Sequence, residues 1–422
     1  VKMFQIGIDM GGTFTDFIAI GNEEFKTVKV PSNKESPIQT VLRGLEELAT
    51  NFNMPLGEFL SKTHKLVHGN TVAINALLQR KGVKTALIST KGFTDTLEMR
   101  RARLDNQWDF FSPIPKVLVP RHLRLPVSER VDYSGKVLQE LVQEDLEEIL
   151  EKLQKEKVES VAVCTLFSFM NPSHEKAIKE YIEERLDNVF VSISSEVSPK
   201  LGEYERVSTT VLNAYLTPLV SRYLDELSHA LKERGLKTDI LLVQNNGGLA
   251  HISYAKDFGV KGLFSGPAAG SSGAKALGEK VLEPNLILVD MGGTSFDVSL
   301  VSDYEIKIMP EAVVGGYPVN LPLVDIESVG IGGGSIASID VGAMLSVGPQ
   351  SAESYPGPAC YDRGGEEPTI TDAALVLGFI EEGDFGGKTM KIRKDLAAQA
   401  IEDKIAKPLH MSVEDGAYGI YQ

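Results

Sequence analysis

A phrase of five residues, Asp-Met-Gly-Gly-Thr, occurs twice in this chain and constrains its fold more than any other feature. Residues 6–21 read IGIDMGGTFTDFIAIG, and residues 287–302 read ILVDMGGTSFDVSLVS. The second aspartate, Asp290, stands 281 positions after the first, Asp9 (290 minus 9). On both sides of each glycine pair, apolar residues follow a strand-like pattern. Each phrase therefore predicts a strand, a tight turn and a returning strand.

A third strand is expected after each hairpin. FKTVKVP at residues 25–31 is matched by YEIKIMP at residues 304–310, with an offset of 279 (304 minus 25). Repeated supersecondary units usually indicate duplicated domains. Between the two copies, strand-like and helix-like segments alternate, which favours an α/β protein over an all-α or all-β one.

The glycine pairs indicate an anion site. Glycines at a hairpin tip adopt positive φ without strain and expose backbone N–H groups that no side chain covers. Such a concavity accepts an anion, most naturally phosphate. Hydroxyl donors stand beside both pairs: Thr13, Thr15, Thr294 and Ser295.

Aspartates flank each tip. Asp9 and Asp290 end the first strand of each copy, and Asp16 and Asp297 lie near the start of each returning strand. Carboxylates repel phosphate unless a divalent cation bridges them, and Mg²⁺ is the usual partner of phosphates. A Gly-Gly turn with a flanking aspartate is also common turn chemistry, but two copies with the same placement favour two phosphate-binding hairpins facing each other across an interdomain cleft.

Two segments outside the repeat predict helices. Residues 203–234 predict a long helix, interrupted or kinked near Pro218. The small residues after Ser265 predict the start of a helix that crosses between the domains, and Ser265 has no sequence-adjacent base that would make it a nucleophile.

Composition excludes several classes of partner. Acidic residues outnumber basic ones 58 to 43, giving a net charge of −15, which disfavours a surface for nucleic acid or an anionic membrane. We find no apolar run near eighteen residues and no signal-peptide pattern at the first residues. With two cysteines in 422 residues, the chain is expected to be a cytoplasmic protein.

Other nucleotide and metal motifs are missing from the sequence. GIGGGSIAS at residues 330–338 does not fit G-x-G-x-x-G, and no G-x-x-x-x-G-K-S/T occurs. A dinucleotide-binding dehydrogenase is therefore disfavoured, although backbone contact between a nucleotide and Gly332, Gly333 or Gly334 stays open. No cluster with the spacing of a zinc site is found.

These residues carry a resemblance to a known family. The paired hairpins resemble the phosphate motifs of the actin, sugar-kinase and heat-shock-chaperone ATPase superfamily. More specifically, the chain resembles the A-type subunit of the hydantoinase and 5-oxoprolinase family, which is related to subunits of acetone and acetophenone carboxylases. The matching phrases include GIDMGGTFTDF, HGNTVAINALLQRKGVKTALISTKGFTDTLEMRR, LFSGPAAGSSGA, LVDMGGTSFDVSL, VGIGGGSIASID and YPGPACYDRGG.

The resemblance implies duplicated ribonuclease-H-like domains of the actin and sugar-kinase type around an interdomain nucleotide cleft. On this basis we expect a first domain over residues 1–275, with an inserted α/β region at about 84–205, and a second domain over residues 276–422. Family A-type chains are usually longer and carry a later Gly-Gly turn that helps to hold adenosine. The second domain is therefore expected to be incomplete.

The resemblance also implies an activity. An A-type chain uses ATP and Mg²⁺ to phosphorylate the carbonyl of a small cyclic amide, such as hydantoin, 5-oxoproline or a lactam, and a B-type partner subunit completes ring opening. An ATP-dependent ketone carboxylase subunit is the close alternative. A nucleotide-binding scaffold or regulatory module without metabolic turnover is the alternative of a different class.

Carried over by position, the resemblance implies two phosphate hairpins. They consist of Asp9, Gly11, Gly12, Thr13 and Thr15, and of Asp290, Gly292, Gly293, Thr294 and Ser295. Asp9, Asp290 and Asp297 are the expected carboxylates for Mg²⁺, held through phosphate, and the individual roles of Asp9 and Asp290 stay open. Candidates for substrate contact are His68, Asn70, Thr71, Arg100 and Arg101. For His68 a buried strand-end histidine is the competing interpretation, and for the arginines a solvated loop.

Overall fold

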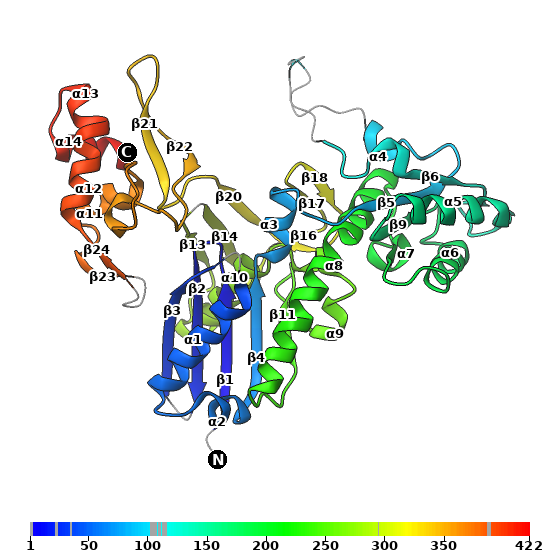
Figure 1. Cartoon of the computed structure of the whole chain (residues 1–422), viewed down its shortest axis with the longest axis horizontal. Coiled ribbons are helices and arrows are strands. Elements are labelled where there is room, and N and C mark those ends of the chain that lie inside the picture. The colour runs from blue at the N-terminus through cyan, green and yellow to red at the C-terminus, as the bar shows by residue number, and fades with distance from the viewer. Residues whose placement is uncertain are drawn as a thin grey trace.

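The computed structural model describes residues 3–21, 24–33, 36–101, 108, 111, 116–293, 295–385 and 390–422. Helices and strands are interleaved through most of this length (Figure 1). The α/β class that the sequence predicted is therefore confirmed.

The first hairpin belongs to a six-stranded sheet with the order β12-β11-β4-β1-β2-β3. Its strands are β1 (Phe4–Met10), β2 (Phe14–Gly21), β3 (Glu24–Pro31), β4 (Thr63–Asn70), β11 (Ile240–Val243) and β12 (Leu249–His251). β1, β2 and β3 form an antiparallel meander, whereas β4 pairs in parallel with both β1 and β11. Both edges of β1 are thus paired within the sheet, which fixes the position of the hairpin tip.

Two helices cover one face of this sheet, α1 (Pro37–Asn51) and α8 (Glu203–Glu233). Alternate side chains of β1 and β2 are buried under them, as expected for strands with one covered face. At Gly44 in α1, an added Cβ would lie 2.2 Å from the Phe17 ring. The missing side chain therefore lets α1 sit directly on β2.

A second sheet lies within the region around residues 84–205. It has the order β10-β9-β5-β6, and every neighbouring pair is parallel. The strands are β5 (Thr85–Thr90), β6 (Arg124–Val127), β9 (Ser160–Cys164) and β10 (Phe190–Ile193), and they pack against α5 (Gln143–Lys155), α6 (Ser173–Glu183) and the first half of α8. The division of the chain into domains stays a prediction.

The second hairpin consists of β13 (Leu286–Met291) and β14 (Phe296–Ser302). The third strand expected over residues 304–310 is only partly formed, which corrects the prediction. β15 (Glu305–Ile306) pairs with the end of β14, but β16 (Ile308–Met309) leaves to pair with β19 (Leu323–Val324). The reason is that β20 (Ile326–Val329) occupies the rest of that edge of β14.

One helix joins the two sheets. α10 (Ser265–Val281) packs against β4 and β11 of the first sheet and against β13 and β14 of the second. The crossing helix predicted after Ser265 is thus confirmed. The interruption expected at Pro218 is wrong, because α8 continues through it. Side chains on both sides of Pro218 are buried in the first core, and this packing outweighs the lost backbone hydrogen bond.

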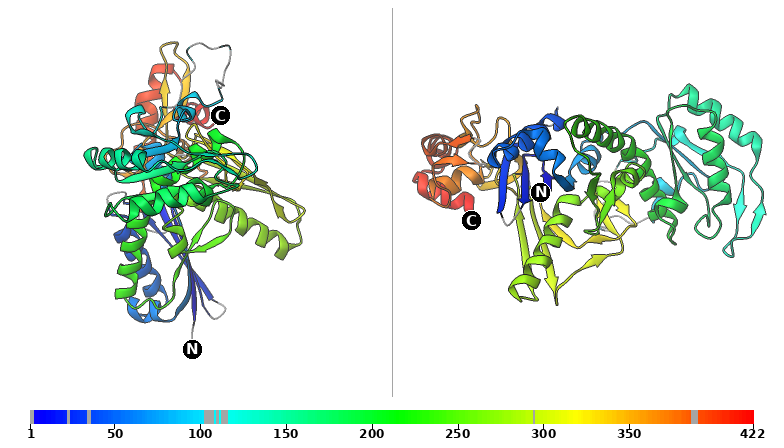
Figure 2. Two further views of the ribbon diagram at one scale, coloured as in Figure 1. Left: turned by 90° about the vertical axis from the view of Figure 1, so that its right-hand side faces the viewer. Right: turned by 90° about the horizontal axis from the view of Figure 1, so that it is seen from below.

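The last part of the chain forms a separate core around the hairpin of β21 (Ser335–Ile339) and β22 (Leu345–Ser351) and three helices. These helices are α11 (Ile370–Val376), α12 (Lys394–Ile401) and α14 (Val413–Tyr421). Figure 2 shows that this core and the parallel sheet of the inserted region lie at opposite ends of the molecule, with the two hairpin sheets between them.

Shorter elements complete the connections. The helical ones are α2 (Leu56–Ser61), α3 (Val72–Leu78), α4 (Thr96–Met99), η1 (Arg121–Leu123), α7 (Ser194–Val197), α9 (Ile252–Ala255), η2 (Gly259–Gly262), η3 (Ala359–Tyr361), η4 (Glu402–Ala406) and α13 (Lys407–Leu409). The strands are β7 (Arg130–Val131), β8 (Val137–Gln139), β17 (Ala312–Val314), β18 (Tyr317–Val319), β23 (Gly383–Phe385) and β24 (Met390–Ile392). Within the described ranges, none of the helices combines the length and the apolar character that crossing a bilayer requires.

Candidate functional site

The first hairpin tip exposes backbone between two carboxylates. Asp9 and Asp16 lie directly opposite each other in the register of β1 and β2. The N–H of Gly11 donates to the carbonyl of Phe14 at 3.0 Å and closes the turn. A Cβ added to Gly12 would meet no atom within 4 Å. The tip therefore offers open space beside its backbone, as an anion cradle requires.

The second hairpin tip repeats this geometry. Asp290 and Asp297 are paired across β13 and β14, and the N–H of Gly292 donates to the carbonyl of Ser295 at 2.9 Å. Each of these residues stands 281 positions after its counterpart in the first tip. The repeat in the sequence is thus a repeat in backbone structure. Thr294, the expected hydroxyl donor of this turn, lies outside the described residues.

The two tips touch. A Cβ at Gly293 would lie 2.7 Å from Thr13 Oγ1, so only glycine lets the second tip approach the first this closely. The loop of residues 332–334, called the glycine loop below, binds the backbone of the second tip. The N–H groups of Gly333 and Gly334 donate to the carbonyls of Gly292 and Gly293 at 3.0 and 2.8 Å. The two tips thus lie next to each other, as expected from the sequence, whereas the phosphate-binding cleft between them stays a prediction.

Because of these bonds, the glycine loop supports the tip and does not offer a free cradle. The remaining N–H of the loop, at Gly332, donates to Ser335 Oγ at 2.9 Å. All three N–H groups that the sequence suggested for nucleotide contact are thus already bonded within the protein.

Asp9 lies where the two sheets and α10 meet. A Cβ at Gly69 or Gly266 would lie 3.3 or 3.1 Å from its Oδ1, so two glycines make room for this carboxylate. The side chain borders solvent, but protein atoms crowd around it. Burial raises the pKa of Asp9 to about 6, and the negative charges of Asp16 and Asp290 add to the rise. Asp9 therefore exchanges its proton near neutral pH.

A single lysine counters this crowding of negative charge. Lys29 Nζ donates to both carboxylate oxygens of Asp16, at 2.8 and 2.7 Å. Burial and the charge of Asp297 raise the pKa of Asp290, while the charge of Lys29 lowers the pKa of both Asp290 and Asp9. Lys29 thus acts electrostatically on both hairpins, although its side chain is bound to the first.

A cavity of about 250 Å³ lies beside the second tip, between α10 and the sheet. Its lining includes the carboxylates of Asp290 and Asp297, and Pro267 and Gly270 supply the helix side. The aspartates of the second tip therefore face open space, large enough for a group of several atoms.

The aspartates do not form a ready-made metal cage. Within the part of the chain that the structure describes, no three His, Cys, Asp or Glu side chains lie close enough together to hold a metal ion. The expected set of Asp9, Asp290 and Asp297 is consistent with a Mg²⁺ held mainly by phosphate oxygens and water, as this ion often is. Burial and neighbouring carboxylates raise the pKa of both Asp9 and Asp290, so a cation bound beside them would favour their ionised forms.

The hydroxyls near the tips differ in placement. Thr15 is fully buried and its Oγ1 lies 2.9 Å from Ser32 Oγ, so this side chain holds β2 to the segment after β3. Ser295 is half-buried, and its hydroxyl points to Asp297 at 3.4 Å. The second of these two hydroxyls thus contacts an aspartate that lines the cavity.

His68 lies inside the core. It is fully buried, and its Nε2 lies 2.7 Å from the hydroxyl of Tyr223. Burial lowers the pKa of His68 to about 4, so the ring is neutral at physiological pH. His68 is therefore a buried histidine at the end of a strand, which was the alternative to a role in substrate contact. Substrate cannot reach the ring in this structure.

Asn70 and Thr71 tie β4 to its neighbours. The Asn70 backbone exchanges two hydrogen bonds with Ser265 Oγ, at 2.9 and 2.7 Å, and its side-chain oxygen accepts from Val72 N. Thr71 Oγ1 donates to the carbonyl of Met10 at 3.2 Å. Both residues thus position α10 and the first tip, and Ser265 serves as a structural link.

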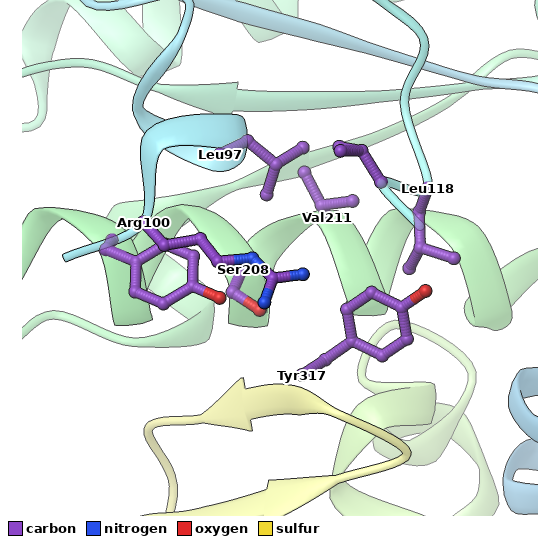
Figure 3. A pocket seen from close by; sticks show the side chains of 8 residues that line it. Leu97, Arg100, Leu118, Ser208, Val211 and Tyr317 are labelled. Carbon is purple, nitrogen blue, oxygen red and sulfur yellow. The ribbon is translucent and has the colours of Figure 1, made fainter. Parts of the chain in front are cut away.

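The two arginines lie away from the tips. Arg101 pairs with Glu205, Nη2 to Oε2 at 2.8 Å. Arg100 lines a separate pocket of about 10 Å³, which has room for about one water. Figure 3 shows its guanidinium beside Ser208, with Tyr317 opposite. The structure therefore does not bring these arginines together with the hairpins.

Three residues of the site were not found from the sequence: Lys29, Gly69 and Gly266. Gly69 and Gly266 meet Asp9 only because β4 and α10 pack there, and no local pattern indicates this. Lys29 could have been recognised by comparing the two copies. It lies in the third strand of the first copy, and the matching residue of the second copy, 279 positions later, is the uncharged Ile308. A charge present in only one of two copies is a candidate for function.

Comparisons with known proteins agree with this geometry. Residues 5–186 match the hydantoinase/oxoprolinase N-terminal region, and residues 206–422 match the hydantoinase/oxoprolinase domain. An uncharacterised protein of Methanocaldococcus jannaschii is 40% identical over 100% of this chain and 63% of its own length. The caprolactamase alpha subunit of Pseudomonas jessenii is 36% identical, over 99% of this chain and 61% of its own length.

Two solved structures share the fold. A nucleotide-free acetone carboxylase matches with a TM-score of 0.86 and 31% identity, and the Pseudomonas jessenii caprolactamase with 0.82 and 36%. This chain spans 61% of each of those chains. The actin-like ATPase fold expected from the hairpins is confirmed by these matches. The chain belongs to the hydantoinase/oxoprolinase family.

Proposed function

We propose that this chain is an ATP-dependent subunit that activates the carbonyl of a small cyclic amide, such as a hydantoin, 5-oxoproline or a lactam, for ring opening. The observation that carries the proposal is the contact between two hairpin tips with the same backbone, each flanked by paired aspartates. The similarity to a caprolactamase subunit supports the choice of a cyclic amide. A B-type subunit is the proposed partner for hydrolysis.

The chemistry fits a site that positions phosphate. An amide oxygen is a poor leaving group until it is phosphorylated, and ATP with Mg²⁺ supplies that phosphoryl group. The protein then has to align and neutralise charged groups more than to make covalent bonds itself. The open backbone at Gly12 and the cavity beside Asp290 and Asp297 suit this task.

Within this proposal, the two strand-end aspartates have different tasks. Asp9, with a pKa of about 6, holds a proton in mild acid and accepts one near neutrality. Asp290 lines the cavity and would help to hold a Mg²⁺ ion that arrives with ATP. Lys29 neutralises the charge of Asp16. This reduces the electrostatic repulsion between the hairpin and an anionic nucleotide.

The test is ATP turnover by the purified chain, alone and with candidate B-type subunits, against a panel of hydantoin, 5-oxoproline and lactams. Stimulation by one cyclic amide is expected, and Asp290→Ala should abolish it. Asp239→Ala, an exposed aspartate before β11, is the matched control and should behave as the parent does. Turnover that no cyclic amide changes would count against the proposal.

A ketone carboxylase subunit is the second candidate. The observation that favours it is the match to acetone carboxylase, whose TM-score exceeds that of caprolactamase. In that case ATP turnover should require a ketone and bicarbonate and ignore cyclic amides. Nucleotide-dependent association of chains without any turnover would instead favour a scaffold.

A further inference from the structure

The pocket of Figure 3 lies where elements far apart in the sequence meet. Its walls come from α4, α8, β18 and the segment that precedes η1, and they include the apolar side chains of Leu97, Leu118 and Val211. Its volume of about 10 Å³ has room for about one water. A ligand that fits inside is therefore a water or a single small ion.

Three polar groups of this pocket can donate hydrogen bonds. They are the guanidinium of Arg100 and the hydroxyls of Tyr204 and Ser208. Ser208 is only 2% exposed, and within the described residues its hydroxyl takes part in no hydrogen bond. Buried polar groups normally have a partner. The Ser208 hydroxyl therefore indicates that the pocket holds a bound group.

The charge of the pocket favours an anion. The guanidinium of Arg100 lies beside Ser208 (Figure 3), and no carboxylate belongs to the described residues that line the pocket. The nearby carboxylate of Glu205 is paired with Arg101, Nη2 to Oε2 at 2.8 Å. A guanidinium against apolar walls has lost part of its hydration, which an anion replaces better than a neutral water does.

The two tyrosines of the pocket have different roles. Burial raises the pKa of both Tyr204 and Tyr317, and the charge of Arg100 opposes this rise. Both phenols thus keep their protons at neutral pH. The hydroxyl of Tyr317 donates to the carbonyl of Lys116 at 2.5 Å, so its proton is already used and Tyr317 supplies a wall. Tyr204 keeps a proton that it can donate into the pocket.

The backbone of Arg100 is strained. Its φ of 54° and ψ of −131° lie in a region that favours glycine. Strain of this kind concentrates at ligand clamps and other functional positions, where the side chain is needed in one place. The position thus carries an arginine at a cost in stability that a glycine would remove.

We propose that this pocket binds one small monovalent anion, chloride by its size and charge. The donors are the N–H groups of Arg100 and the hydroxyls of Tyr204 and Ser208. Because α4, α8 and β18 all contribute to the walls, the bound ion holds β18 against the inserted region. The site needs neither ATP nor a cyclic amide, so it is independent of the proposed function.

The experiment is thermal unfolding of the 422-residue chain while chloride replaces gluconate at constant ionic strength. Gluconate is too large for the pocket, and the screening of surface charges stays the same. We expect the melting temperature to rise with chloride and to saturate, as binding to the folded state requires. Ser208→Ala should raise the half-saturating chloride concentration at least about tenfold, as expected for a hydrogen bond to a charged group.

Arg100→Gly is the sharpest variant, because it should change binding and stability in opposite directions. We expect it to abolish the effect of chloride and to raise the melting temperature in gluconate, since glycine adopts this backbone without strain. Lys157→Gly is the matched control. Lys157 is an exposed cation after α5 with a φ of 53°, so its replacement should raise stability and leave the chloride dependence as in the parent.

Crystals grown in bromide locate the ion directly. The anomalous signal of bromide should appear beside Arg100 in the parent chain and be missing from Arg100→Gly. A chloride dependence that persists in Arg100→Gly would overturn the proposal. So would a bromide peak without any saturable chloride dependence in solution, because the pocket would then hold an adventitious ion only.

Discussion

The two hairpins have the same backbone and different electrostatic surroundings. In the first, the strand-end carboxylate of Asp9 lies against Gly69 and Gly266, and Lys29 neutralises the opposite aspartate. In the second, Asp290 faces a cavity of about 250 Å³. The duplication therefore preserved the turn that can hold phosphate, while the side chains around it diverged. The difference indicates a division of tasks between the two aspartates.

Replacement of each aspartate by asparagine tests this division most strongly. If Asp9 accepts a proton during turnover, Asp9→Asn should lower kcat by about 1,000-fold, whereas Asp290→Asn, which keeps an oxygen ligand, should lower it by about 100-fold. The measurement is steady-state ATP turnover with the best cyclic amide. Equal losses, with no difference in pH dependence, would mean that the two carboxylates share one role.

The pH dependence of the reaction distinguishes Asp9 in another way. Its pKa is raised to about 6, so kcat/KM should fall about tenfold per pH unit below pH 6 and level off above it, because the ionised form is the proton acceptor. A profile without a break between pH 5 and 7 would contradict this assignment.

Stability provides a check on Asp9 that needs no substrate. The folded chain holds the Asp9 proton up to about pH 6, whereas the unfolded chain releases it near the ordinary value of 3.8. Folding thus takes up a proton in this window, and the contribution of Asp9 to the free energy of unfolding falls as the pH rises from about 4 to 6. Asp9→Asn should remove that component.

His68 contributes the opposite slope in the same window. Its pKa is lowered to about 4 in the folded chain, so unfolding takes up a proton and stability is lost as the pH falls from about 6.5 to 4, by about 3 kcal/mol in all. Thermal unfolding of His68→Gln and Asp9→Asn from pH 4 to 7 separates the two contributions.

Lys29 is expected to have a smaller effect than either strand-end aspartate. Lys29→Met leaves Asp16 unneutralised beside the phosphates, so the KM for Mg-ATP should rise by about fivefold, the factor that corresponds to about 1 kcal/mol for a partly exposed pair. The break in the pH profile should also move to higher pH, because Lys29 lowers the pKa of Asp9. Lys29→Arg should restore both values, and Lys26→Met, on the same strand, should change neither.

The sequence predicted the parts of this site that depend on local pattern. Both hairpins, their paired aspartates and the crossing helix after Ser265 follow from strand alternation, glycine pairs and small residues. The third strand of the second copy was predicted wrongly, because β20, which competes for the edge of β14, comes from residues 326–329. No local pattern reveals such a competitor.

Roles that depend on long-range packing could not be predicted either. His68 and Thr15 stand beside recognisable motifs, but the first is paired with Tyr223 in the core and the second with Ser32. Lys29 is ordinary in a strand sequence and gains its importance only where β3 lies next to Asp16. A motif thus places residues near a site, while packing decides which of them face it.

The two hydroxyls provide the mildest test of the comparison between hairpins. Thr15 is buried and bonded to Ser32, so Thr15→Val should lower the free energy of unfolding by about 1 kcal/mol and leave the KM for Mg-ATP unchanged. Ser295 donates to Asp297, which lines the cavity, so Ser295→Ala should raise that KM by about threefold, as expected for one hydrogen bond, with little change in stability. Chemical denaturation and ATP kinetics on the two variants measure both quantities. If the two effects were exchanged, the hydroxyl that faces the ligand would belong to the first hairpin, and the second tip would be the one held by side-chain bonds.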